Sequence, residues 1–256
     1  MSSHAAQTLW EARLNHEILP RNFQGCPNSE EDAYAIQKVM ITKCNRQVIG
    51  WKLGATSAAA MEIVGVTKPF IGPLFSDFCH KDGDEIELYS GEVLETEFTL
   101  KIKTDIPYQP EAHPIALVEA AIGAIIPSFE IVGCRFGGTI NNSGFRPIAD
   151  GGANISCILG QEFSNIDFQN LGTHKATLKI NGEQVATGQP SDLSWTPLIE
   201  SVSWLSCQPI MAGRGLIAGD IVMTGTVTGM TPLAPGDIAE ADFGELGVLR
   251  AQFHDR

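Results

Sequence analysis

The sequence predicts an α+β protein in which a small helical N-terminal part adjoins a larger, mixed domain that is mostly β. Two segments with apolar residues at helical spacing lie within residues 1–45. From residue 46 onward the chain changes to short β-rich runs that are separated by glycine. Its 256 residues, of which 43% are hydrophobic and 18% charged, are enough to bury a sizeable core.

The N-terminal helices are predicted over residues 5–19 and 29–45. Ser29 is a suitable N-cap for the second helix. Three acidic residues in the first turn of this helix interact favourably with the helix dipole. The connecting residues 20–28 are rich in proline, glycine and asparagine, which is typical of a loop. The sequence therefore predicts a helical pair before the β-rich region.

The β-rich region contains two further predicted helices, at residues 111–126 and 196–211. Asn181-Gly182 between strand-like flanks indicates a tight hairpin. We expect a soft boundary near residues 80–90, which divides the chain into an N-terminal segment, residues 1–88, and a C-terminal segment, residues 89–256. The predicted strands are 48–54, 85–90, 93–102, 129–136, 155–160, 176–182, 219–225 and 248–253.

The charge balance excludes several partner classes. The chain has 17 Lys and Arg against 30 Asp and Glu, a net charge of −13, which should repel nucleic acid and anionic membranes. No apolar run reaches transmembrane length, and charges interrupt the N-terminal segment where a signal peptide needs an apolar stretch. Six scattered cysteines without a C-x-x-C pair favour reduced thiols. We therefore expect a cytoplasmic protein that acts on a small molecule.

Two glutamates stand out in the predicted strand 93–102. Because side chains alternate across a strand, Glu95 and Glu97 project from the same face and repel each other unless a positive charge lies between them. One interpretation is a solvated outer face, on which Glu97 and Lys101 lie in water. The other is a site that binds a cation.

A third acid, Glu130, lies between Phe129 and Ile131 in a strand that should be buried. A buried acid is costly unless it is paired, for example with Arg135, or bound to a metal. Three such acids suit a hard divalent cation with oxygen ligands. Lys52 lies in a strand-like run before Gly54, and one interpretation is that its side chain extends to solvent. The other is that it neutralises the cation site, because the charges of three carboxylates and a divalent cation sum to −1.

A glycine loop follows the predicted strand 219–225. The segment from Gly225 to Gly229 includes Thr226 and can bring backbone N–H groups and hydroxyls close to a ligand. It is neither a P-loop nor a G-x-G-x-x-G fingerprint, and a plain β-turn is the alternative interpretation.

In this order, these segments resemble the 2-keto-4-pentenoate hydratase / 4-oxalocrotonate decarboxylase family, within the fumarylacetoacetate hydrolase superfamily. The resemblance spans the chain from about residue 8 to the C-terminus. The matching words are "AYAIQ" (33–37), "GWKLGATS" (50–57), "LETEFTLKI" (94–102), "PSFEIVGCRF" (127–136), "IADGGANISCILG" (148–160) and "GDIVMTGTVTGMTPLAPGD" (219–237).

The resemblance implies a β-roll or barrel-like catalytic domain of the fumarylacetoacetate hydrolase type over residues 89–256. It implies that Glu95, Glu97 and Glu130 bind Mg²⁺ or Mn²⁺, and that Lys52, from the N-terminal segment, is the active-site lysine. The further candidates for substrate binding are Asp150, Thr226 and Leu74. One departure lies beside Asp150, where the family's A-D-N-A-S is replaced by Ala-Asp-Gly-Gly-Ala over residues 149–153.

The family's chemistry implies a metal-dependent lyase that acts on a small 2-oxo acid in aromatic catabolism. A hydratase would convert 2-hydroxypenta-2,4-dienoate to 4-hydroxy-2-oxopentanoate. The alternative, a decarboxylase of 2-oxo-3-hexenedioate, needs a cation for the second carboxylate, for which Arg13, Arg21 and Arg146 are candidates. Asp192 near the expected tail of the pocket favours hydration, because it repels such a carboxylate.

Two other functions remain open. An acylpyruvate hydrolase of the superfamily would use a His–Glu pair, and His16-Glu17 is the only hint of one. From another class, the chain could be a non-catalytic subunit of a hydratase–decarboxylase complex, against which the retained carboxylates argue. The resemblance implies a homo-oligomer built from dimers, and the apolar segment 196–211, whose second face needs cover, is consistent with an oligomer.

Overall fold

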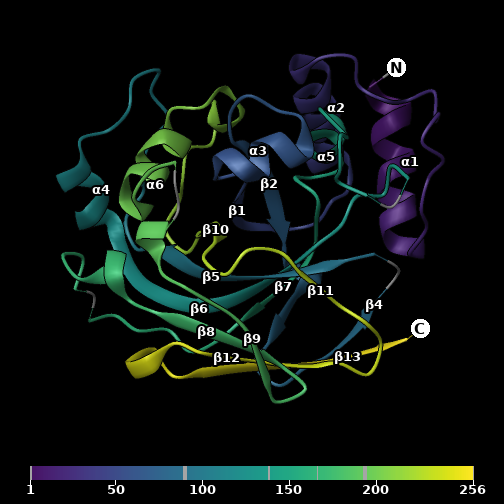
Figure 1. Ribbon diagram of the computed structural model, residues 1–256. Helices are drawn as coiled ribbons and strands as arrows, with labels where there is room; N and C mark the ends of the chain where they lie inside the picture. The colour runs from purple at the N-terminus through teal and green to yellow at the C-terminus, as the bar shows by residue number, and fades with distance from the viewer. Residues whose placement is uncertain (1, 89–90, 138, 166, 193–194, 256) are drawn as a thin grey trace.

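The computed structural model describes residues 2–88, 91–137, 139–165, 167–192 and 195–255. Figure 1 shows two β-sheets, one above the other, with the helices gathered above the upper sheet. The helices are α1 (Ser2–Asn15), α2 (Glu30–Lys43), α3 (Ala58–Val64), α4 (Ile115–Ala121), α5 (Arg146–Ala149) and α6 (Leu198–Ser206).

The larger sheet is curled. Its strand order is β2-β1-β10-β5-β6-β7-β3, with β11 paired to β5. Gly72 in β2 nevertheless lies against Gly151 and Gly152, just before β7, although four strands separate β2 from β7 in the sheet. The strands are β1 (Val48–Gly54), β2 (Phe70–Phe75), β3 (Cys79–Lys81), β5 (Val93–Ile102), β6 (Ile122–Val132), β7 (Asn154–Leu159), β10 (Ile221–Thr226) and β11 (Thr231–Pro232).

Strands β5 and β6 form the long antiparallel centre of this sheet, in a register that sets Glu95 opposite Glu130. On the other parity, Phe98 packs toward the second sheet and makes an edge contact with Phe243 at 5.2 Å between ring centroids. Because faces alternate along a strand, the glutamates lie on the opposite, inner side of the curl. Lys52 in β1 lies on the same side, since its register partner Gly72 faces Gly151 and Gly152 across the curl.

The second sheet has the order β4-β13-β12-β8-β9 and lies below the first (Figure 1). Strand β4, and β13 from Val248 to Phe253, alternate between buried and exposed residues, which is expected when one face covers a core and the other meets water. The strands are β4 (Glu85–Leu88), β8 (Ala176–Ile180), β9 (Glu183–Gly188), β12 (Ile238–Asp242) and β13 (Val248–Asp255).

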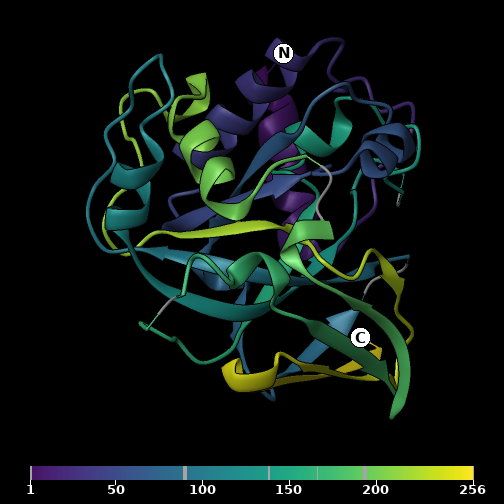
Figure 2. The ribbon, with the colours of Figure 1, turned by 60° about the vertical axis from the view of Figure 1, so that its left-hand side comes forward.

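The N-terminal helices α1 and α2 form the predicted pair and lie side by side in both ribbon views (Figures 1 and 2). Ser29 caps α2 as expected, with its hydroxyl accepting from the Asp32 amide at 3.0 Å. The hairpin prediction is also confirmed. Asn181 and Gly182 both have positive φ, and β8 and β9 are joined directly by these two residues.

The helix predicted over 111–126 is confirmed for Ile115–Ala121 and wrong for residues 111–114 and 122–126. Helix α4 ends at Ala121, and residues 122–126 begin strand β6. The run Ile122–Ile126 is almost entirely apolar, and such a run fits a fully buried strand as well as a buried helix. The protein uses it as a strand because this run pairs with β5, and Ile125 also forms an isolated bridge with Phe163.

Helix α6 is covered by the rest of the chain more completely than the sequence predicts. Most of its residues are buried by the chain itself, so the uncovered apolar face expected for 196–211 is not observed over α6. The predicted boundary falls beside residues 89–90, which lie outside the described residues, as does the end of the predicted strand 85–90. The division at 88/89 stays a prediction, and strands from both segments pair in both sheets.

Across the described residues, no helix has both the length and the apolar character needed to cross a bilayer.

Candidate metal centre

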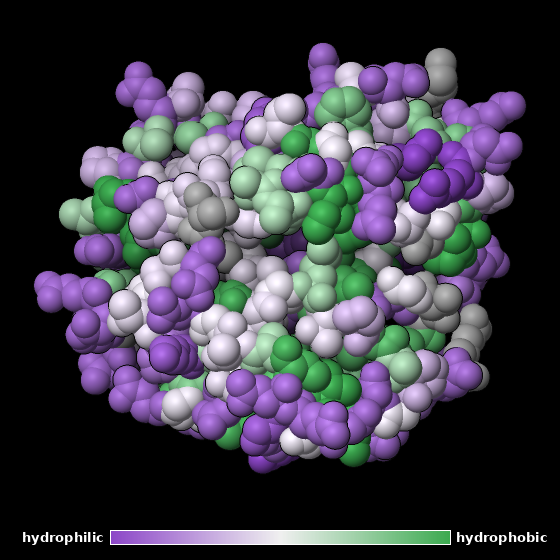
Figure 3. Space-filling view, viewed as in Figure 1, coloured by the Kyte–Doolittle hydropathy of each residue, from purple (hydrophilic) through white to green (hydrophobic). Residues whose placement is uncertain are grey.

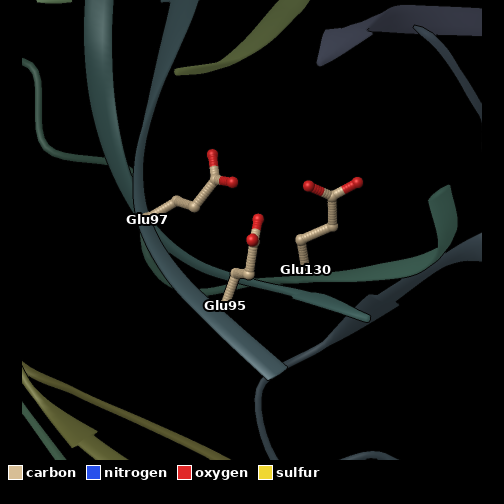
Figure 4. A group of neighbouring side chains, drawn as sticks. All are labelled: Glu95, Glu97 and Glu130. Carbon is tan, nitrogen blue, oxygen red and sulfur yellow. The ribbon is translucent and has the colours of Figure 1, made fainter. Parts of the chain in front are cut away.

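Three carboxylates converge on the inner side of the curled sheet. Glu95 and Glu97 rise from β5 and Glu130 from the neighbouring β6, with all three turned toward a common space (Figure 4). One carboxylate oxygen of each lies within 4.8 Å of the others. Glu97 and Glu130 are fully buried, and Glu95 is partly exposed. The solvated outer face is therefore wrong for Glu97, whereas Lys101 is half-buried and pairs with Glu162.

Lys52 is the buried cation beside this group. Its side chain is 2% exposed, and its Nζ lies 3.1 Å from Glu130 Oε2. The salt-bridge interpretation of Glu130 thus holds with Lys52 as the partner, because Arg135 pairs instead with Asp150. Three ionised carboxylates and one lysine leave a buried charge of −2, which a divalent cation would neutralise.

The electrostatics of the metal-free site reflect this excess of negative charge. Burial raises the pKa of Glu95 to about 7, although Lys52 opposes the shift. Burial, with Glu130 and Glu95 nearby, raises the pKa of Glu97 well above its usual value. Burial would lower the pKa of Lys52, but Glu130, Glu95 and Glu97 outweigh it and raise that pKa. The lysine thus stays protonated, while Glu95 and Glu97 bind protons more readily than usual, and a metal ion would displace these protons.

The hydrogen bonds leave oxygen atoms open for a cation. Glu97 Oε2 accepts from the Gly225 amide at 2.9 Å, whereas Glu97 Oε1 is buried with no hydrogen-bond partner among the described residues. A buried carboxylate oxygen without a partner is costly in a metal-free protein and is explained by an ion at this position. Three carboxylates are also the hard oxygen ligands that Mg²⁺, Mn²⁺ or Ca²⁺ takes. The residues fit a divalent metal ion.

Two contributors to the site were not identified from the sequence. Asn154, the first residue of β7, donates from its Nδ2 to Glu130 Oε1 at 2.9 Å. Arg13, from α1, donates to the main-chain oxygen of Asn154 at 2.7 Å. From the sequence, Arg13 is a candidate only as a cation for a substrate's second carboxylate. No local pattern links it to Asn154, which is 141 residues away along the chain.

The three predicted substrate residues occupy different surroundings. Leu74 lies on the inner side of the curl in a buried apolar cluster with Ile126, Cys157, Ile221 and Met223. Thr226 is the last residue of β10, opposite Glu97, and its hydroxyl donates to the Gly229 oxygen at 3.0 Å. Asp150 is buried, and its two oxygens accept from the amide and the guanidinium of Arg135.

Comparison with known proteins shows which family the chain belongs to. Residues 137–254 match the family described as fumarylacetoacetate (FAA) hydrolase C-terminal. A hydratase from Pseudomonas putida, named TodF product hydratase, is 30% identical over 97% of this chain and 94% of its own. A 2-keto-4-pentenoate hydratase from Paraburkholderia xenovorans is 29% identical over 97% of this chain and 93% of its own. The chain is therefore a member of the fumarylacetoacetate hydrolase superfamily.

Within it, the chain belongs to the 2-keto-4-pentenoate hydratase / 4-oxalocrotonate decarboxylase family. The 4-oxalocrotonate decarboxylase from Pseudomonas putida G7, solved with magnesium and adipate, superimposes with a TM-score of 0.86. It is 25% identical in sequence, and the match covers 98% of this chain and 97% of that one. The same decarboxylase has been solved with calcium and acetate.

The raised pKa values predict a pH dependence of the metal-free protein. Between pH values of about 4.5 and about 7, Glu95 in the folded protein binds a proton more tightly than Glu95 in the unfolded chain does. The free energy of unfolding therefore falls as the pH rises through this window. Glu97 shifts in the same direction. Denaturant unfolding in a chelating buffer, at several pH values across the window, measures this slope.

The matched control for this prediction is the double variant Glu95→Gln/Glu97→Gln, whose slope should be flatter because the two titrating groups are gone. Adding Mg²⁺ at the upper end of the window should restore stability to the unaltered protein alone. A slope identical in the two proteins would show that these carboxylates do not carry the raised pKa values.

Proposed function

We propose that the protein is a metal-dependent hydratase that adds water to 2-hydroxypenta-2,4-dienoate, or a close analogue, in aromatic catabolism. The observation that carries the proposal is the buried group of Glu95, Glu97 and Glu130 with Lys52 beside it. The names of the relatives support the same class, because hydratases match across nearly the whole chain. The product would be a 4-hydroxy-2-oxo acid.

Glu95, Glu97 and Glu130 would hold the cation, for which Mg²⁺ and Mn²⁺ are the candidates. When bound, such an ion acts as a Lewis acid on the oxygens of a 2-oxo acid and favours the enolate form of the substrate. The protein contributes a dry, prearranged site, since Glu97 and Glu130 are fully buried and Gly225 fixes one oxygen of Glu97.

Lys52 is the proposed catalytic residue. Its pKa is raised by the three glutamates, so its Nζ carries a proton at neutral pH. A buried ammonium group can hold the substrate carboxylate and can deliver a proton when the dienol becomes the conjugated keto acid. The strand β1 fixes this group in place by pairing with β2 and β10 on its two sides. On the predicted division, the N-terminal segment supplies Lys52 and the C-terminal segment supplies the carboxylates.

The rest of the proposed pocket suits a short substrate with an apolar tail. Leu74 and its neighbours Ile126, Ile221 and Met223 form an apolar wall on the same side of the sheet as the carboxylates. Thr226 and the Gly225 amide lie at the edge next to Glu97. We also retain Asp150 as a substrate-side residue, acting through the orientation of Arg135 and of loop 149–153.

The second candidate function is decarboxylation of 4-oxalocrotonate, which the structural match to the Pseudomonas putida decarboxylase favours. Such a substrate brings a second carboxylate and needs a cation for it. Among the described residues, three buried cations already have partners within the chain. Arg13 bonds to Asn154, Lys52 pairs with Glu130, and Arg135 pairs with Asp150. Arg21 is exposed and Arg146 half-buried, and neither is positioned toward Glu130 by an observed contact. This distribution supports hydration.

The charge of Asp192 gives less support than the sequence indicated. Asp192 is exposed, and its carboxylate accepts from the amide and side chain of Gln189. Its expected role of repelling a substrate carboxylate stays a prediction.

The hydrolase alternative is not favoured, because His16 pairs with Glu87 in the second sheet. The non-catalytic alternative is not favoured either, because a subunit without activity does not need the buried glutamates and Lys52. Six free cysteines support a cytoplasmic location.

We further propose that the protein is a homo-oligomer built from dimers. The described chain leaves several large apolar side chains at least one third exposed, and the face in Figure 3 carries apolar patches among polar residues. They are Leu14, Ile18, Ile63, Ile115, Leu117, Val185, Ile217, Ile238 and Val248. Sedimentation at micromolar concentration should give a species larger than the 27.5 kDa chain, and a monomer alone would contradict the proposal.

The function is tested by supplying purified protein with 2-hydroxypenta-2,4-dienoate and with 2-oxo-3-hexenedioate, each with and without Mg²⁺. We expect Mg²⁺-dependent loss of the dienoate and little release of carbon dioxide. Lys52→Met should lower kcat by about a hundredfold or more if the residue moves a proton. Lys101→Met, which alters a half-buried lysine paired with Glu162 away from the carboxylates, is the matched control and should retain activity.

Two results would contradict the assignment in different ways. Carbon dioxide release from the hexenedioate that matches or exceeds hydration of the dienoate would make the protein a decarboxylase with the same metal site. Turnover without a divalent cation would remove the metal from the mechanism.

A further inference from the structure

Glu130 is held from both sides before any cation arrives. Lys52 Nζ lies 3.1 Å from its Oε2, and Asn154 Nδ2 donates to its Oε1 at 2.9 Å. Asn154 is 1% exposed and also donates to the Ser156 main-chain oxygen at 3.3 Å. The side-chain amide therefore has a fixed place between β6 and the start of β7.

Arg13 fixes which end of this amide faces Glu130. Its Nη2 lies 3.2 Å from Asn154 Oδ1, and it donates to the main-chain oxygens of Asn154 and Ile155 at 2.7 and 3.0 Å. A guanidinium has donors and no acceptor, so the amide oxygen must turn toward it and the NH₂ group must turn toward the carboxylate. The opposite orientation would set two donors against each other and an oxygen against Glu130.

Arg13 is itself held firmly. It lies in α1 with 1% of its surface exposed, and its guanidinium stacks over the Phe78 ring at 4.3 Å from the centroid, with Phe75 at 5.5 Å. A planar cation between rings and carbonyl oxygens loses little freedom when it forms these hydrogen bonds. The N-terminal helix is thus connected to the carboxylate group through one amide.

We propose that Asn154, oriented by Arg13, is a positioning residue that sets the Glu130 carboxylate for cation binding. The inference rests on the proposed metal site. A carboxylate held at one oxygen by an amide and at the other by an ammonium group cannot rotate freely, so its remaining lone pairs point in fixed directions. Partners of this kind typically change metal affinity by about 10- to 100-fold.

The first test is Asn154→Leu, which keeps the approximate shape and removes the donor. Calorimetric titration of the full-length, metal-stripped variant with Mn²⁺ should give a dissociation constant raised about tenfold or more. Asn154→Ala repeats the test should the larger side chain disturb folding, which circular dichroism checks. The control is Gln37→Met, because Gln37 is also a buried amide, and its Nε2 donates to the main-chain oxygens of Ile71 and Ile148, away from the carboxylates. It should leave the Mn²⁺ affinity unchanged.

The second test is Arg13→Met, for which positioning and simple electrostatics predict opposite signs. Removing a buried positive charge near a cation site should tighten Mn²⁺ binding by Coulomb's law. If Arg13 acts by orienting Asn154, binding should weaken instead, and the loss should disappear when Arg13→Met is added to Asn154→Leu.

An unchanged Mn²⁺ affinity in Asn154→Leu and Asn154→Ala, with Glu97→Gln abolishing binding, would overturn the positioning role and leave the metal site intact. Tighter binding in Arg13→Met would overturn the role assigned to Arg13. Absence of Mn²⁺ binding by the unaltered protein would overturn the metal site and this inference together.

Discussion

The structure depends on the repulsion among three carboxylates that share one low-dielectric space with a single lysine. Glu97 and Glu130 are completely buried, and Lys52 is 2% exposed, so water cannot screen the excess of negative charge. Without a cation, burial raises the pKa of Glu95 to about 7 and the pKa of Glu97 well above its usual value, so these two carboxylates bind protons more readily. A divalent ion removes the imbalance, and the same excess of charge that costs stability provides affinity for the ion.

The backbone is shaped so that these charges can come together. The curl of the large sheet brings Gly72 against Gly151 and Gly152, and a Cβ at Gly72 would lie 2.3 Å from the Gly151 oxygen. At Gly225, with φ +103, a Cβ would lie 2.0 Å from Thr56 Oγ1, yet it is this residue's amide that binds Glu97. Glycine at such points permits a close approach that places Lys52, the Gly225 amide and the glutamates around one space.

Much of the site could be predicted from the sequence because it depends on local rules. Alternation along β5 puts Glu95 and Glu97 on one side, and the apolar neighbours of Glu130 require a partner for its charge. Arg13 and Asn154 could not be predicted, since their contact depends on how α1 docks against the start of β7, 141 residues further along the chain. The start of β6 was mistaken for helix because its apolar run, Ile122–Ile126, lacks a distinguishing period.

The most direct test of the account is a crystal structure of the protein soaked with Mn²⁺, with anomalous scattering recorded to locate the ion. We expect one strong peak bounded by carboxylate oxygens of Glu95, Glu97 and Glu130, at about 2.1 Å from each, since oxygen ligands of such ions lie near this distance. Lys52 should remain paired beside it. A peak elsewhere, or no peak among the three glutamates at saturating Mn²⁺, would contradict the claim that Glu95, Glu97 and Glu130 bind the ion.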